Sequence, residues 1–74
     1  MSYNYSKLIG KIIETYGTRR AFACKLGVSE RTLSLKLNNK IPWDQKEIDK
    51  AISLLNLSSN DVVVYFFTQN VQYH

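Results

Sequence analysis

The side chains best suited to bind another molecule lie in the first half of the chain. Arginine and lysine carry fixed positive charge, and arginine can donate two parallel hydrogen bonds to a phosphate or to the edge of guanine. Residues 7–40 hold eight Lys or Arg against two Glu, whereas residues 41–74 hold two Lys against four acids. The basic half favours a polyanionic partner, although a solvated basic surface would have the same composition.

Groups for enzyme catalysis are sparse. The chain has one His, at its last position, and one Cys, and its acids are not clustered. No nucleophile–base pair or metal-ligand set can be assembled from them, so we expect no enzyme activity, no metal and no cofactor. Cys24 has no second thiol beside it, and we expect it to be a small apolar residue of the core.

The length of 74 residues predicts a single small domain spanning 1–74. A lone cysteine cannot form an internal disulfide, which suits a reducing compartment. The N-terminus carries charges within its apolar pattern, unlike a signal peptide, and no stretch approaches the ~20 apolar residues of a membrane span. We therefore expect a soluble intracellular protein without a membrane segment.

Apolar spacing and cap residues predict a run of short helices that position the basic side chains. The first has Asn4 or Ser6 as its cap and Gly17 after its end. Its apolar positions are Leu8, Ile9, Ile12, Ile13 and Tyr16.

A pair of eight-residue helices follows, separated by Gly27-Val28-Ser29. Thr18 caps the first and Gly27 ends it, with Ala21, Phe22, Cys24 and Leu26 as its apolar positions. The second, "SERTLSLKLNN", has Ser29 as its cap and Leu33 and Leu37 as a buried stripe. Leu35 points away from that stripe. This pair organises the molecule.

The rest of the chain predicts two more helices. Asn38–Pro42 forms a loop, after which Asp44 and Glu47 match a capping box and Trp43 and Ile48 a hydrophobic staple. The inward stripe of this fourth helix is Ile48, Ala51, Ile52 and Leu55. Ser58 caps a last helix over 59–66 with Asp61 in its first turn, and 67–74 is an irregular or short extended tail. The fold class is all-α, a compact bundle of about five short helices.

The segment "TRRAFACKLGVSERTLSLKLNNK" resembles the helix-turn-helix of the phage repressor and Cro superfamily, here about residues 18–38. Phe22-Ala23 falls on that pattern's Leu-Ala pair, Leu26–Ser29 on its turn and Leu33 on its branched position. With "EIDKAISLL" and "YFFTQNVQ", most of residues 3–72 looks like a narrower group of small phage proteins called Cro-like. That group includes antirepressors of the modulator-of-repression type.

The resemblance implies a DNA-reading geometry in which the start of the second helix of the pair faces base edges. The residues that would read bases are Glu30, Arg31, Ser34 and Leu35. The residues that would bind phosphate are Thr18, Arg19, Arg20, Asn38 and Lys40. Arg31 would pair with guanine, Glu30 with cytosine N4 and Leu35 with a thymine methyl.

Four departures from the family pattern bear on this interpretation. Arg19 replaces the usual Gln that anchors to phosphate, and Asn39 replaces a Gly. Lys36 stands where an apolar residue is usual, so its stem is expected to reach past the edge of the core. Leu35 on the outward face suits a protein interface at least as well as a DNA groove.

Two functions therefore stay open. In the first, the chain is a Cro-like repressor that binds double-stranded operator DNA through helix 30–38. It would act as a symmetric homodimer, formed through the C-terminal region, with half-sites about 34 Å apart. In the second, it is an antirepressor that covers the DNA-reading surface of a phage repressor protein. Both place it in the cytoplasm of the bacterial host.

Overall fold

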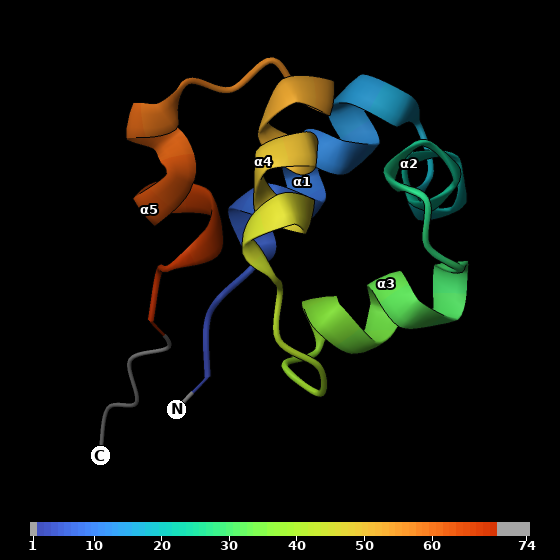
Figure 1. The fold of residues 1–74 in the computed structure, drawn as a ribbon, viewed down its shortest axis with the longest axis horizontal. Coiled ribbons are helices and arrows are strands. Elements are labelled where there is room, and N and C mark those ends of the chain that lie inside the picture. The colour runs from blue at the N-terminus through green and yellow to red at the C-terminus, as the bar shows by residue number, and fades with distance from the viewer. Residues whose placement is uncertain (1, 70–74) are drawn as a thin grey trace.

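The computed structural model describes residues 2–69, which form an all-α bundle (Figure 1), as the sequence predicts. The helices are α1 (Ser6–Tyr16), α2 (Arg19–Leu26), α3 (Glu30–Leu37), α4 (Gln45–Leu54), the 3-10 turn η1 (Ser59–Asp61) and α5 (Val62–Phe66). β structure in this range is limited to one antiparallel bridge between Tyr3 and Gln69. Of the predicted irregular or short extended tail over 67–74, residues 67 and 68 are irregular and Gln69 forms this bridge, while residues 70–74 lie outside the described range.

The core lies where α1 and α4 meet the other helices. Figure 1 shows α1 and α4 together in the middle, with the α2–α3 pair on one side and α5 on the other. Every α-helix contributes at least one buried side chain, and Tyr5 adds another ahead of α1. The buried apolar residues are Tyr5, Leu8, Ile12, Phe22, Ala23, Leu26, Leu33, Leu37, Ala51, Leu55 and Phe66.

The predicted helix caps are largely confirmed, because they depend on neighbours in the sequence. Thr18 Oγ1 accepts from the amide of Ala21 at 3.1 Å, and Ser29 Oγ accepts from that of Thr32 at 3.0 Å. Gly17 and Gly27 end their helices with φ of +83° and +91°, values that favour glycine. The start of α1 differs in detail.

Tyr5 is the N-cap residue of α1, but it makes no side-chain cap hydrogen bond. Asn4 instead accepts from the amide of Ser6 at 2.9 Å. At α4, Asp44 and Glu47 form both halves of the capping box. At η1, the carboxylate of Asp61 accepts from the amide and hydroxyl of Ser58, both at 3.1 Å.

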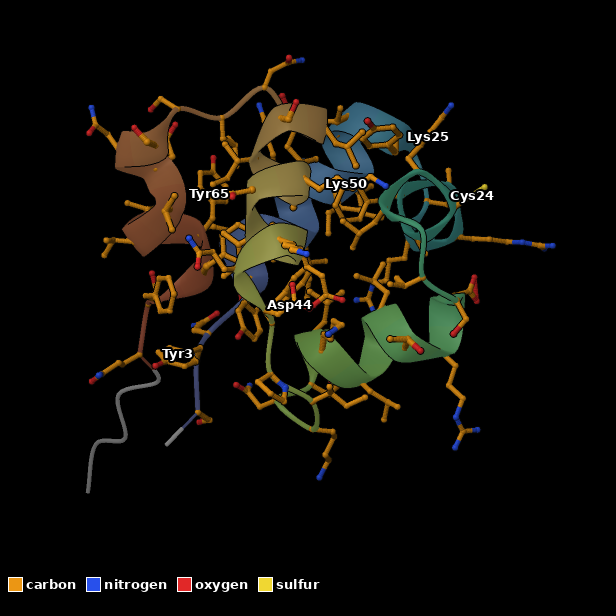
Figure 2. The ribbon with its side chains drawn as sticks, in the orientation of Figure 1. Tyr3, Cys24, Lys25, Asp44, Lys50 and Tyr65 are labelled. Carbon is orange, nitrogen blue, oxygen red and sulfur yellow. The ribbon has the colours of Figure 1, made fainter. Side chains whose placement is uncertain are left out.

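One core prediction is wrong. Cys24 is exposed, not in the core, and lies on the outer side of α2 (Figure 2). Phe22, Ala23 and Leu26 take the inward positions of α2, and at about 100° per residue Cys24 falls on the opposite side from Phe22. Of the apolar positions predicted for α1, Leu8 and Ile12 are fully buried, whereas Ile13 is 43% exposed.

Candidate interaction surface

The outward side of α3 carries the four side chains predicted to read bases or bind a partner. Glu30 and Arg31 are exposed, while Ser34 and Leu35 are half-buried. We call these four residues the α3 face. Leu33, on the side of the helix opposite Arg31 and Leu35, is fully buried, which fixes the rotation of α3 about its axis. Leu35 therefore presents only part of its side chain to a partner.

The loop after α3 is tied to the helix through Leu35. Its carbonyl accepts from the amide of Lys40 at 2.8 Å and from that of Ile41 at 3.4 Å. Asn39 adopts φ +62°, a conformation that Asn tolerates better than most residues. Asn38 and Lys40 are both exposed near the C-terminal end of the α3 face.

Several exposed positive charges of α2, α3 and the loop after α3 make no ion pair among the described residues. Arg19 and Arg20 lie exposed in the first turn of α2, next to the exposed cap residue Thr18. Ion pairs within residues 2–69 are confined to Lys11–Glu14 and Lys36–Glu47, so Arg19, Arg20, Arg31 and Lys40 make none there. These cations are available to a phosphate or a carboxylate of a partner. Their assignment to phosphate binding stays a prediction, as does the helix-turn-helix assignment of α2 and α3.

Lys36 is placed differently from the sequence-based expectation. Its stem was expected to carry the charge past the edge of the core, but the residue is only 5% exposed. Its Nζ lies 2.7 Å from Glu47 Oε1 and 3.0 Å from the carbonyl of Pro42, and 5.8 Å from the centre of the Trp43 ring. The charge is satisfied inside the fold, because Glu47 lies within its reach.

Sequence reasoning missed this ion pair because Glu47 already had a role in the capping box. The sequence did contain a signal for this ion pair. Lys36 is the one lysine of α3 and stands at a position that is usually apolar, and the carboxylate of Glu47 follows eleven residues later at the start of the next helix. Such a lysine needs either solvent or a partner. The pair holds α3 to the beginning of α4 and so positions the α3 face.

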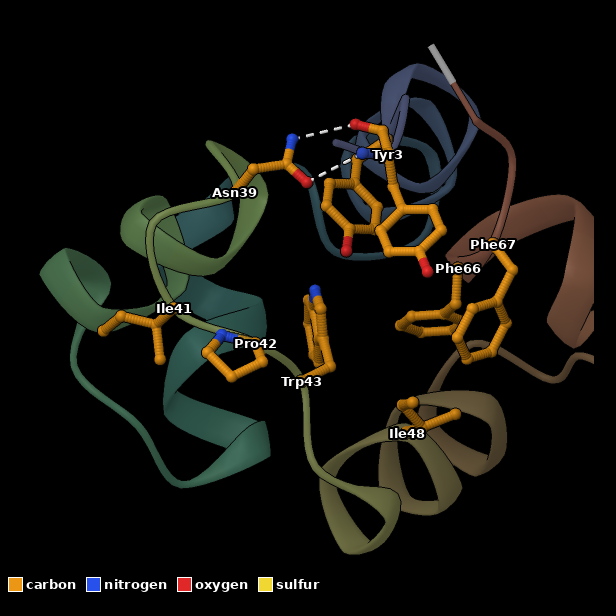
Figure 3. Close-up of a pocket in the computed structure, with 9 residues that line it drawn as sticks. Tyr3, Asn39, Ile41, Pro42, Trp43, Ile48, Phe66 and Phe67 are labelled. Carbon is orange, nitrogen blue, oxygen red and sulfur yellow. Dashed lines mark hydrogen bonds between the residues drawn. The ribbon is translucent and has the colours of Figure 1, made fainter. Parts of the chain in front are cut away.

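A hollow of about 330 Å³ opens beside the α3–α4 loop (Figure 3). Its lining residues are Tyr3, Tyr5, Asn39, Ile41, Pro42, Trp43, Ile48, Phe66 and Phe67. Trp43 and Ile48, the predicted staple pair, both line it. The Asn39 amide accepts from Tyr3 N at 2.8 Å and donates to Tyr3 O at 2.9 Å, so one wall joins the loop to the N-terminal segment.

Aromatic rings pack tightly around this hollow. Trp43 meets Phe66 edge-on with ring centres 5.1 Å apart, and Tyr3 meets Phe67 edge-on at 5.7 Å. Burial raises the pKa of the Tyr5 hydroxyl above its ordinary value of 10.0, and the neighbouring Tyr3 raises it further. The aromatic packing joins residues from both ends of the described chain.

Residues 2–69 contain neither a metal-binding cluster nor a membrane-spanning helix. No three His, Cys, Asp or Glu side chains in this range are grouped so that they could hold a metal ion. None of the described helices has the length and apolar character needed to cross a membrane. The α3 face, the unpaired cations and the aromatic hollow are among the exposed features of this range, and each of them could bind another molecule.

Comparison with known proteins identifies a family and a structural relative. The model of the family described as "Protein of unknown function (DUF739)" matches residues 1–69. The solution structure of the modulator of repression of the temperate bacteriophage TP901-1 from Lactococcus lactis is similar, with a TM-score of 0.80 and 51% sequence identity. The match covers 97% of this chain and 97% of the relative. No curated protein matches the chain.

Proposed function

This chain belongs to the DUF739 family, and we propose that it is an antirepressor, which binds a phage repressor protein and blocks the repressor's access to operator DNA. The observation that carries the proposal is the 51% identity to a phage modulator of repression, over nearly the whole length of both chains. Of the two functions that the sequence left open, this similarity favours the second.

The α3 face has the composition of a small protein-binding surface. Leu35 is apolar and half-buried, and Arg31 is exposed one turn before it on the same helix. Protein interfaces commonly combine an apolar centre with arginine, which stacks and donates several hydrogen bonds at once. In this proposal, Leu35 packs against the repressor while Arg31 pairs with a carboxylate or carbonyl of it.

Operator binding by the chain itself is the second candidate, and the unpaired cations favour it. Arg19, Arg20, Arg31 and Lys40 are exposed without an ion pair among the described residues. Cations in this state can neutralise phosphates. They could equally meet acidic side chains of a repressor, so charge does not separate the two candidates.

Calorimetric titration in the absence of DNA tests the proposal. The chain would be titrated with the repressor of the phage or prophage that carries its gene. Saturable binding at a simple stoichiometric ratio supports the antirepressor. If titration with the repressor gives no heat of binding, and the chain binds the operator on its own, the chain is an operator-binding protein and not an antirepressor.

A further inference from the structure

The aromatic hollow beside the α3–α4 loop forms a pocket separate from the α3 face, because no residue of the α3 face lines it. Its floor is made of buried rings, Tyr5 and Phe66, while Asn39, Pro42 and Phe67 at its rim are exposed. The volume of about 330 Å³ falls at the lower end of the roughly 300–1,000 Å³ typical of ligand pockets. The hollow is thus open to a partner and large enough for a bulky apolar side chain.

Trp43 contributes to this pocket an indole N–H group that has no hydrogen-bond acceptor within residues 2–69. Its indole Nε1 is buried and has no hydrogen-bond partner among the described residues. Figure 3 shows this nitrogen on the side of the ring that is turned toward Tyr3, across the pocket. A buried donor without an acceptor is costly, and tryptophan N–H groups usually find a partner when buried. The pocket therefore suits a ligand that brings an acceptor oxygen.

Charge restricts the ligand further. None of the nine lining residues carries a charged side chain. Lys36 lies 5.8 Å from the centre of the Trp43 ring, but Glu47 already pairs with it at 2.7 Å. A carboxylate would lose its hydration in the pocket without gaining a free cation. The occupant is accordingly a neutral group.

We propose that this pocket binds an apolar side chain of the repressor, and that a backbone carbonyl of the same repressor segment accepts the Trp43 N–H. This inference rests on the proposed function. It is favoured by the connection to the α3 face, because the carbonyl of Leu35 accepts from Ile41, which lines the pocket. A repressor segment bound to the α3 face would reach the pocket along the α3–α4 loop. An aromatic or branched side chain in a pocket is the usual form of an interface anchor.

The single tryptophan makes the pocket directly observable. Trp43 is the only Trp in the chain, so a protein labelled with ¹⁵N gives one indole N–H resonance. On titration with unlabelled repressor, we expect this resonance to move downfield as its proton enters a hydrogen bond. We expect the tryptophan fluorescence to change over the same concentration range.

Two variants at the pocket and one matched control complete the test. Phe67→Ala removes a rim side chain that is 44% exposed, and Ile13→Ala removes one that is 43% exposed on α1 and does not line the pocket. Affinity for the repressor should fall about tenfold or more for Phe67→Ala and stay unchanged for Ile13→Ala. Trp43→Phe, which keeps a ring but removes the N–H, should cost about three- to tenfold.

The outcomes separate this inference from the proposed function. If wild-type chain binds the repressor while the indole resonance stays in place and folded Phe67→Ala binds normally, the pocket proposal is overturned and the antirepressor stands. If wild-type chain does not bind the repressor, both are overturned. The wild-type resonance answers the question even if a variant fails to fold.

Discussion

Lys36 Nζ lies 2.7 Å from Glu47 Oε1, and this contact joins α3 to the first turn of α4. The two side chains are 6% and 19% exposed, so the pair is largely shielded from water. The same Glu47 oxygen also accepts from the amide of Asp44 at 3.0 Å in the capping box. One carboxylate oxygen thus fixes both the start of α4 and the position of α3.

Replacement of Lys36 by Met should destabilise the fold, although methionine is apolar and of similar length. It leaves the Glu47 carboxylate without its cation in a poorly solvated place. Removing one partner of a buried pair typically costs several kcal/mol, and we expect about 3 kcal/mol here. Urea denaturation measures the change. Lys40→Met, at an exposed position, should alter the free energy of unfolding by no more than about 0.5 kcal/mol.

The double variant Lys36→Met/Glu47→Gln separates charge from shape. Glutamine keeps an acceptor for the Asp44 amide but removes the isolated negative charge. The double variant should therefore be more stable than Lys36→Met alone. If it is less stable than that single variant, the loss comes from packing around Lys36 rather than from an uncompensated carboxylate.

Leu33→Ala tests the assignment of the buried side of α3. Leu33 is fully buried, so its truncation removes apolar contacts and leaves a cavity, at a cost of about 2–5 kcal/mol. That approaches the whole stability of so small a domain. Chemical denaturation with a loss below ~1 kcal/mol would mean that α3 is rotated differently from the structure.

Leu35→Ala should weaken binding to the repressor by about 2 kcal/mol, because an apolar anchor at the centre of an interface is lost. Arg31→Ala should weaken it as well, through loss of a charge-assisted hydrogen bond. Calorimetry measures both affinities, and circular dichroism checks the fold, since Leu35 is half-buried. Wild-type affinity in both folded variants would show that the α3 face is not the working surface.

Tyr5 should make the fold sensitive to alkaline pH. Its pKa is raised in the folded chain, first by burial and then by the nearby Tyr3, so the unfolded chain loses this proton at a lower pH. The contribution of Tyr5 to the free energy of unfolding is present in full below about pH 10. It is lost as the pH rises toward the pKa that Tyr5 has in the folded chain. The free energy of unfolding should fall less steeply above pH 10 in Tyr5→Phe than in wild type. Equal slopes in urea denaturation would contradict this linkage.

Much of the fold was predictable because its signals are local. The caps at Thr18, Ser29 and Asp44 and the glycine after α2 each depend on residues within a few positions in the sequence. The misplaced Cys24 has a different cause. A short helix with mixed apolar residues allows more than one inward face, and packing against the other helices decides between them.

The candidate site was predictable only in part. The α3 face follows from helical spacing once Leu33 is taken as buried. The Lys36–Glu47 pair and the aromatic hollow depend on contacts between segments far apart in the sequence. Asn39 binds Tyr3 across 36 positions, and Phe67 comes from the far end of the described chain. No pattern within one segment carries that information.

A mobility-shift competition measures whether the chain removes the repressor from its operator. The repressor is bound to its labelled operator, and the chain is added in increasing amounts. If the chain is an antirepressor, the repressor–operator complex disappears near stoichiometric amounts of the chain, and the chain alone does not shift the operator. If the repressor's shift persists while the chain alone shifts the same DNA, the chain is an operator-binding protein and not an antirepressor. In that case, the logarithm of the chain's affinity for the operator would fall with the logarithm of the salt concentration at a slope of roughly −4 to −5. This slope is expected when four to six phosphates are neutralised.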